Sequence, residues 1–360
     1  MSSLFLLLSL VAADPAAALD ELTRDAERKL AEAVVTVMNK RLVSPSGDKH
    51  DLFGLAPYHW PNPDDPGGKA VFRDGRVNPE ANTDAYDRVA YFRFTDAVLT
   101  LSAAYRHTRD ERFAAGAARW LRAWLVDPQT RMNPNLNYCQ CIVGESKGMP
   151  IGIIRGVALV QFTKCEAVLA ESRHWSAEDR AAFRQWMAEY LTWLRESELG
   201  RAEARAVNNH GTWYDAQVAA LALFTGDPEL AKATVEGAKK NRIALQIQPD
   251  GRQPFEMLRT KSWDYAILNL EGLFTLANVG DAVGVDLWNY QTVDGRSLRK
   301  ALDFLLPYAS GAKKWSARQI VPFDPAALAP LLRRAARAYG EATYTPADET
   351  AQSLLIVAFD

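Results

Sequence analysis

The five residues Asn208-Asn209-His210-Gly211-Thr212 place two amide side chains and an imidazole directly before an apolar segment. Further along the chain, Arg259 adds a guanidinium and Tyr265 adds a phenol. An amide and a guanidinium can neutralise a carboxylate, and an imidazole and a phenol can transfer protons. These groups suit β-elimination at a uronate sugar, which needs a neutralised carboxylate, removal of a carbon-bound proton and protonation of a glycosidic oxygen.

Each step of such a reaction has a candidate residue. Asn209 and Arg259 would bind the uronate carboxylate and stabilise the enolate-like charge that develops when the C5 proton leaves. Tyr265 would act as acid or base. An unperturbed tyrosine has a pKa near ~10, so a base role needs cationic neighbours, and Arg259 and His210 are available. The structural alternative is that the stretch around Asn208 only caps the following helix.

Several motifs resemble the alginate lyase superfamily, which includes polysaccharide lyase family 5 and the related family 38. Asn208-Asn209-His210 matches the Asn-Asn-His of these families, and Arg259 and Tyr265 follow His210 by 49 and 55 residues, in the family's order of histidine, arginine and tyrosine. Two earlier segments are similar to the family's amino-terminal aromatic and central motifs, namely Tyr58-His59-Trp60-Pro61-Asn62-Pro63 and Met132-Asn133-Pro134-Asn135-Leu136-Asn137-Tyr138-Cys139-Gln140. The resemblance covers residues 51–277.

The resemblance implies a role for each residue of the set. Asn209 and Arg259 would neutralise the substrate carboxylate, Tyr265 would transfer protons, and His210 would orient Tyr265 or serve as the alternative base. The segment Gly211-Thr212-Trp213-Tyr214-Asp215 departs from the Ser-Tyr-Trp continuation expected in family 5. This departure favours a more distant branch and leaves the preferred uronate open.

The longest irregular segment, residues 56–84, is rich in Pro, Gly, Asn and Asp. Long ordered loops of this kind often form lids or binding elements, so we predict a cleft wall or lid. Tyr58, His59 and Trp60 would offer flat faces and polar edges to pyranose rings. The alternative is that these aromatic residues fix the loop to the core.

Three more side chains are predicted to bind substrate. Arg88 could reach a carboxylate, although a structural pair with Asp87 or Asp84 is the alternative. Gln140 could hold the uronate carboxylate through its amide, or bond to loop backbone instead. Trp213 and its neighbour lie where a helix should begin, and adjacent helical residues do not share a face, so one of the two would face the cleft.

Apolar residues recur at helical spacing along most of the chain, which predicts an all-α fold built from helical hairpins. Successive pairs could close into an (α/α) toroid, an incomplete α/α barrel, and the resemblance implies that fold; periodicity alone does not separate it from an open solenoid. We expect one domain over residues 14–360. The predicted helices cover 19–43, 89–105, 113–126, 151–170, 183–194, 212–224, 230–245, 262–277, 298–308, 326–339 and 350–359.

The charge balance limits the partners. With 42 basic and 44 acidic residues the formal net charge is -2, so an acidic polysaccharide would need a local basic cleft. The sequence contains no long basic run or known nucleic-acid motif, and we expect no nucleic-acid partner.

The first thirteen residues resemble a secretion signal. A short apolar stretch over 4–13 ends in Val11-Ala12-Ala13, a small-residue cleavage site, which predicts a periplasmic or secreted protein. The alternative is a buried amino-terminal helix. The stretch is too short for a bilayer, where ~20 apolar residues are needed, so no stable membrane insertion is expected.

Cysteine usage excludes a disulfide scaffold, because the chain has three cysteines, Cys139, Cys141 and Cys165. Their spacing also lacks the paired motif of a structural zinc site. We expect buried thiols, no metal and no cofactor, with one bridge from Cys165 left open for an exported protein.

These observations predict a metal-independent polysaccharide lyase that cuts 1,4-linked uronates and leaves 4,5-unsaturated ends. Mannuronate-rich alginate is the first choice, and glucuronan is the alternative. A helical-toroid glycoside hydrolase would need two carboxyl groups, for which Asp215 and Asp250 are the candidates. A periplasmic uronate-binding protein without turnover is the non-enzymatic alternative. Oligomeric state is not predicted.

Overall fold

The computed structural model describes residues 15–65, 67–142, 144–145, 147–340 and 344. Its contacts divide the described residues into two compact units: unit 1 comprises those up to residue 199, and unit 2 comprises those from residue 200 onward. The expected signal peptide at 1–13 and the expected helix at 350–359 lie outside the described residues. A single domain over 14–360 stays a prediction.

Unit 1 is built around helix α3 (Arg88–Thr108), which packs against α2 (Pro15–Ala31), α4 (Glu111–Leu121) and α5 (Val157–Leu169). Phe94 of α3 stacks on Trp124 with ring centres 4.7 Å apart and 3° between the planes. Arg109 ends α3 in the left-handed region with φ 58°, and Asp110 caps α4 by accepting from Arg112 N. This short turn makes α3 and α4 a helical hairpin.

The second half of unit 1 continues the helical pattern. A π-helical turn, η4 (Arg122–Val126), packs against α6 (Ala177–Glu196), and a 3-10 segment, η5 (Pro150–Gly156), leads into α5. Ser176 and Asp179 form a capping box at the start of α6, the pairing of side chain and backbone that favours helix initiation.

The predicted helix over 19–43 is shorter in the structure, because α2 ends at Ala31. A separate 3-10 turn, η2 (Val37–Asn39), follows, with Thr36 and Asn39 in a capping box. Lys40 then directs its buried ammonium to the carbonyls of Val37, Lys49 and Asp51, at 2.6 to 2.9 Å. These bonds require irregular backbone around the ammonium, which apolar periodicity does not reveal.

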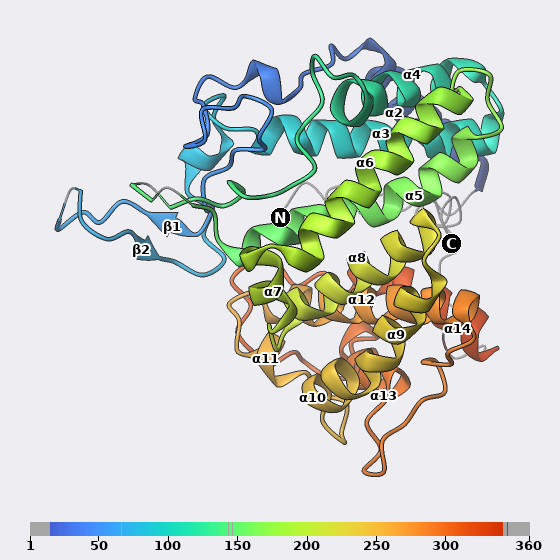
Figure 1. The fold of residues 1–360 in the computed structure, drawn as a ribbon. Coiled ribbons are helices and arrows are strands. Elements are labelled where there is room, and N and C mark those ends of the chain that lie inside the picture. The colour runs from blue at the N-terminus through green and yellow to red at the C-terminus, as the bar shows by residue number, and fades with distance from the viewer. Residues whose placement is uncertain (1–14, 66, 143, 146, 341–343, 345–360) are drawn as a thin grey trace. The chain divides into compact units, whose positions relative to one another are not determined.

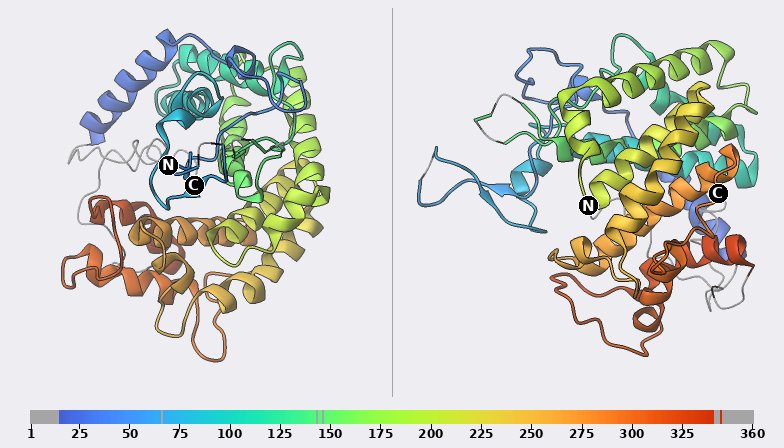
Figure 2. Two further views of the ribbon diagram at one scale, coloured as in Figure 1. Left: turned by 90° about the vertical axis from the view of Figure 1, so that its left-hand side faces the viewer. Right: turned by 60° about the horizontal axis from the view of Figure 1, so that its bottom comes forward.

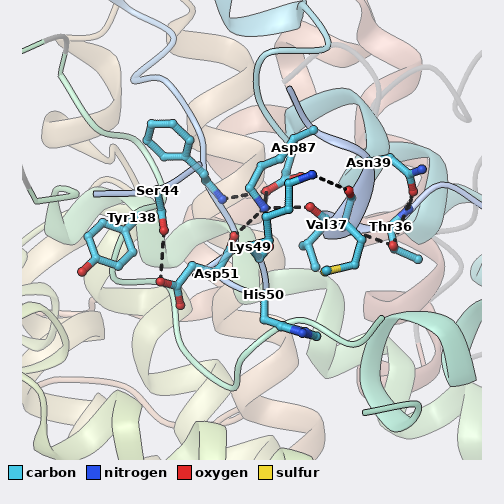
Figure 3. Close-up of polar contacts among 12 residues, drawn as sticks. Thr36, Val37, Asn39, Ser44, Lys49, His50, Asp51, Asp87 and Tyr138 are labelled. Carbon is cyan, nitrogen blue, oxygen red and sulfur yellow. Dashed lines mark hydrogen bonds and ion pairs between the residues drawn. The ribbon is translucent and has the colours of Figure 1, made fainter. Parts of the chain in front are cut away.

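The same region is joined by further polar contacts (Figure 3). The Ser44 hydroxyl donates to the carboxylate of Asp51, and Thr36 lies beside the amide of Asn39. Asp87 accepts from the ammonium of Lys40 at 3.1 Å. Burial raises the pKa of Asp87 to about 7, against the opposing charge of Lys40.

The irregular segment 56–84 contains a small antiparallel hairpin, β1 (His59–Trp60) with β2 (Val71–Phe72), in which His59 pairs with Phe72. A 3-10 turn, η3 (Pro79–Asn82), completes the segment. The hairpin projects away from the helices of unit 1 in Figure 1 and in the right-hand view of Figure 2.

Unit 2 is built around two apolar helices, α8 (Asn209–Thr225) and α12 (Ser262–Val283), which pack against each other and against α9 (Pro228–Ala238). They approach closely at Gly272, where a Cβ would lie 2.9 Å from Thr212 Cγ2. The remaining elements are α7 (Glu198–Ala204, which starts at the end of unit 1), η6 (Lys239–Ile243), α10 (Ala244–Gln246), α11 (Pro254–Met257), α13 (Leu298–Ala309), η7 (Pro325–Leu328) and α14 (Ala329–Tyr339).

The prediction of an all-α fold built from helical hairpins is confirmed by this element order, in which helices alternate with short turns. Among the residues that the structure describes, no helix has the length and apolar character needed to span a membrane.

Candidate active site

The Asn208-Asn209-His210 stretch starts helix α8 of unit 2. Asn208 is the N-cap, and its side chain accepts from His210 N at 3.2 Å. The structural interpretation of this stretch as a helix cap is therefore correct for Asn208. The cap also places Asn209 and His210 in the first helical turn, where their side chains have fixed directions.

Asn209 is held by a buried carboxylate. Glu256 of α11 accepts from the backbone N–H of Asn209 at 2.6 Å and from its side-chain amide at 2.7 Å. Both residues are buried, and burial raises the pKa of Glu256, while the two bonds from Asn209 and the charges of Arg259 and His210 act in the opposite direction. Asn209 is fully buried, and its Oδ1 has no hydrogen-bond partner among the residues that the structure describes.

His210 is held by a second buried carboxylate. Glu203 of α7 lies with Oε1 2.7 Å from His210 Nδ1, and the two side chains are 2% and 13% exposed. An ionised carboxylate can only accept a hydrogen bond, so Nδ1 donates. In the neutral ring Nε2 is then the unprotonated nitrogen, which is the state required of a proton acceptor.

A buried ion pair supports the backbone between Glu203 and His210. Arg242 donates to both carboxylate oxygens of Asp215 at 2.7 and 3.1 Å, and to the carbonyls of Ala204 and Ala206 at 2.8 Å. Gly211 lies against this arrangement, and a Cβ there would overlap Ala206 O and the Arg242 guanidinium. The Arg242 guanidinium and the close approach of Gly211 therefore hold the turn between Glu203 and His210 in place.

The side chains of Arg259 and Tyr265 are in direct contact. Arg259 lies just after α11, and Tyr265 lies in the first turn of α12. Nη2 of Arg259 donates to the Tyr265 hydroxyl oxygen at 2.9 Å, and its guanidinium carbon lies 3.9 Å from the centre of the ring. A guanidinium in this position stabilises negative charge on a phenol oxygen.

Glu256 contacts both Asn209 and Arg259. Its backbone carbonyl accepts from Arg259 N at 3.1 Å, while its side chain holds Asn209. The structure thus brings Asn209, His210, Arg259 and Tyr265 into unit 2 on three neighbouring segments.

Trp213 lies one turn further along α8. It is buried, and its indole N–H donates to the carbonyl of Leu268 in α12 at 2.9 Å. This contact packs the indole at the crossing of the two helices. A contact between Trp213 and substrate stays a prediction.

The aromatic residues predicted to bind sugar lie in unit 1, on or beside the β1–β2 hairpin. Tyr58 and His59 both pack edge-on or tilted against Phe72, with ring centres 6.3 and 5.3 Å apart. Trp60 lies under the guanidinium of Arg73 and donates to the carbonyl of Arg76 at 3.0 Å. All three are partly exposed. The contacts show that these rings hold the hairpin together, and both earlier interpretations remain compatible with them.

Arg88 and Gln140 line one pocket of unit 1. Arg88 bonds to the side chain of Asn82 instead of pairing with Asp87 or Asp84. Gln140 donates to the carbonyl of Ile151 at 3.3 Å and has a φ of 57°, in the region that non-glycine residues rarely adopt. Substrate binding by these two residues stays a prediction.

The three cysteines are buried as free thiols. Burial raises the pKa of Cys139 to about 11 and the pKa values of Cys141 and Cys165 to about 12. Within the described ranges, no group of three or more His, Cys, Asp or Glu side chains could hold a metal ion.

Sequence reasoning missed Glu203 entirely and did not identify the contact between Glu256 and Asn209. Glu203 precedes His210 by seven residues, in a short helix without apolar periodicity. The only signal for this contact in the sequence was a glutamate a short distance before the Asn-Asn-His stretch. The turn at Ala206, which brings the side chains of Glu203 and His210 together, could not be predicted from the sequence.

A family model described as alginate lyase matches residues 36–315. A solved structure described as an alginate lyase from Bacteroides ovatus has 33% identity and a TM-score of 0.89, and the match covers 95% of this chain and 93% of that chain. No curated protein matches the chain.

Two more distant structures share the fold. A histidine-to-alanine variant of alginate lyase A1-III complexed with a tetrasaccharide has 16% identity and a TM-score of 0.55 over 97% of both chains. The apo form of that variant has 16% identity and a TM-score of 0.52, covering 92% of this chain and 90% of that chain. The fold class expected from the sequence, an all-α (α/α) toroid, is confirmed.

Proposed function

Because the chain belongs to the alginate lyase family and is a polysaccharide lyase, we propose that it cleaves 1,4-linked uronate polymers by β-elimination, with mannuronate-rich alginate as the preferred substrate. The observation that best supports this proposal is the contact between Arg259 and Tyr265, in which one guanidinium donates to the phenol oxygen and covers the ring. This contact prepares a tyrosine for proton transfer next to a group that binds carboxylates.

In the proposed reaction, Arg259 and the side-chain amide of Asn209 bind the uronate carboxylate. Their donors stabilise the enolate-like charge that spreads onto this carboxylate as the C5 proton leaves. The Tyr265 phenolate takes the C5 proton, the bond from C4 to the glycosidic oxygen breaks, and a double bond forms between C4 and C5. The same phenol then protonates the leaving oxygen, so Tyr265 returns to its starting state.

His210 has a supporting role on this substrate. Glu203 holds its Nδ1, so Nε2 is available as a hydrogen-bond acceptor for the phenol or the substrate. On a guluronate unit the C5 proton lies on the opposite face, and His210 would then be the base with Tyr265 as the acid. We propose mannuronate first because the Arg259 contact prepares the tyrosine.

Glucuronan is the second candidate substrate for a chemical reason. Mannuronate and glucuronate differ at C2, so C5–H and the C4 leaving oxygen have the same relative arrangement in both. Tyr265 can therefore serve both polymers. The substrate contacts proposed for unit 2 involve the carboxylate and the leaving oxygen, and these positions do not distinguish the two sugars.

A glycoside hydrolase is disfavoured by the two carboxylates that it would need. Asp215 is buried, and both of its oxygens accept from Arg242, whereas Asp250 is about half exposed and pairs with Arg252 at 2.7 Å. Burial raises the pKa of Asp215 against the effect of Arg242. Neither group resembles an acid and base placed on either side of a glycosidic bond.

The proposal is tested by incubating the protein with polymannuronate, polyguluronate, glucuronan and a neutral polysaccharide while recording ultraviolet absorbance. A 4,5-unsaturated uronate conjugates its new double bond with the carboxylate and absorbs, whereas a hydrolase releases sugar ends without this chromophore. We expect absorbance to rise fastest with polymannuronate. Binding without product would favour the uronate-binding protein instead, and export to the periplasm or the medium stays a separate proposal.

A further inference from the structure

Two arginines of unit 1 share one aromatic ring. Arg88 lies in the first turn of α3, Phe92 lies one turn later, and Arg155 lies in η5. The guanidinium carbons of Arg88 and Arg155 lie 4.9 and 4.6 Å from the centre of the Phe92 ring. Both side chains are partly buried, and both line the pocket that contains Gln140.

The positive charge of this pair is not compensated by a neighbouring carboxylate. Within the described part of the chain, neither guanidinium forms an ion pair, and Nε of Arg88 is buried without a hydrogen-bond partner. Burial, and then the charge of Arg155, lowers the pKa of Arg88 to about 10. Two like charges held together without a counter-ion create a site that attracts an anion.

The other polar groups of the pocket are already engaged. Asp87 lines it too, but its Oδ2 accepts from Phe53 N at 2.8 Å and lies 3.1 Å from the Lys40 ammonium, so Lys40 offsets its charge. Tyr91 donates its hydroxyl to the carbonyl of Arg155 at 2.8 Å. The net charge that faces the pocket therefore comes from Arg88 and Arg155.

The size of the pocket limits the anion. Its free interior is that of about one water molecule, so it excludes a sugar ring and leaves room only for a small group of a larger ligand. The left-handed backbone of Gln140 shapes one wall, and strained backbone of this kind is concentrated at ligand sites. A planar guanidinium matches a carboxylate with two parallel donors.

We propose that Arg88 and Arg155 form a carboxylate-binding position for a uronate of the polymer, and that Arg155 is a further substrate-binding residue. This inference rests on the proposed function for the identity of the anion, a sugar carboxylate. The position would contribute to the affinity for the polymer chain.

The experiment compares the wild-type protein with Arg155→Gln and Arg88→Gln, using initial rates on polymannuronate. Arg195→Gln is the matched control, because Arg195 is an exposed arginine in the last turn of α6 of the same unit. We expect KM to rise about tenfold or more in both pocket variants, in line with loss of a charge-assisted hydrogen bond. We expect kcat to change much less, and the control to match the wild type.

Folding is checked by thermal unfolding of each variant. If Arg155→Gln does not fold, Arg88→Gln and the charge-retaining Arg155→Lys decide the matter, and Arg155→Lys should lie between wild type and the loss of charge. An unchanged KM in the folded pocket variants would overturn the proposal. An equal rise in KM in Arg195→Gln would overturn it as well, because the loss of any surface charge would then be enough to raise KM.

Failure of the proposed function is distinguishable from failure of this inference. If the wild-type protein forms no unsaturated product from any uronate polymer, the lyase proposal fails, and calorimetry with a saturated mannuronate oligosaccharide then tests the pocket alone. Binding that is present in the wild type and about tenfold weaker in Arg155→Gln would support the carboxylate position. Equal binding by both proteins, or binding by neither, would reject it.

Discussion

Glu203 Oε1 lies 2.7 Å from His210 Nδ1, and both side chains are largely buried. The carboxylate fixes which ring nitrogen carries the proton. Buried carboxylates that hold a histidine in this way commonly determine its orientation and basicity. His210 is therefore oriented by α7 as well as by its place in α8.

Replacing Glu203 with Gln should lower turnover on polymannuronate by about 10-fold to 100-fold, the range found when a supporting partner of a functional histidine is lost. The amide oxygen of glutamine can still accept from Nδ1 but carries no negative charge, so the pH dependence of kcat should also shift. Glu198→Gln is the control, because Glu198 lies in the same helix and is 86% exposed. An unchanged pH profile and turnover would limit Glu203 to a packing role.

Arg259→Lys keeps a positive charge but loses the planar pair of donors that can serve the phenol and a carboxylate together. We expect kcat/KM on polymannuronate to fall by about 100-fold, a loss of about 2.7 kcal/mol of transition-state stabilisation. Arg252→Lys provides the comparison, because Arg252 is exposed and pairs with Asp250. Equal efficiency of Arg259→Lys and the wild type would show that another residue neutralises the carboxylate.

Gly211→Ala should disturb the site without removing any functional group. The new Cβ would overlap Ala206 O and the Arg242 guanidinium, so the backbone between Glu203 and His210 must shift. We expect the free energy of unfolding to fall by about 1–3 kcal/mol, as for other overpacked sites, together with turnover. In Gly237→Ala the nearest atom would be Asn241 Nδ2 at 3.6 Å, so thermal unfolding of that control should match the wild type.

Asp87 should make stability depend on pH. Its pKa is raised to about 7 by burial, whereas an unfolded aspartate titrates near ~3.9. The folded protein therefore binds this proton more tightly, and the resulting stabilisation is present below pH ~4 and is lost as pH rises to about 7. Denaturant unfolding of Asp87→Asn should show a flatter pH dependence over this range. The exposed Asp84→Asn should keep the wild-type slope, and an equal flattening in both would contradict the assignment.

The helices could be predicted from the sequence because most have one apolar side with regular spacing. The Asn208 cap and the grouping of His210 with Arg259 and Tyr265 were also accessible, since these residue types suit a single reaction. Their actual contact, 2.9 Å between Arg259 Nη2 and the Tyr265 oxygen, depends on how α11 and α12 meet and could be confirmed only in the structure.

Buried polar contacts were harder to predict. Lys40 looked like part of a long helix, but its ammonium bonds to three carbonyls and approaches Asp87, a residue 47 positions away. Glu203 and Glu256 have no periodic signal, because a buried carboxylate is stabilised by one specific partner and not by a repeating face. Such pairings depend on tertiary structure, and local spacing does not encode them.

The most direct test of the account is Tyr265→Phe, which removes the hydroxyl and keeps the ring under Arg259. Formation of unsaturated product from polymannuronate and calorimetric binding of a saturated oligosaccharide would be measured on the same folded variant. We expect binding close to that of the wild type and turnover lower by at least ~10²-fold, the usual contribution of acid and base catalysis. Turnover close to the wild-type rate would contradict the central role of Tyr265 and would show that another residue transfers the proton.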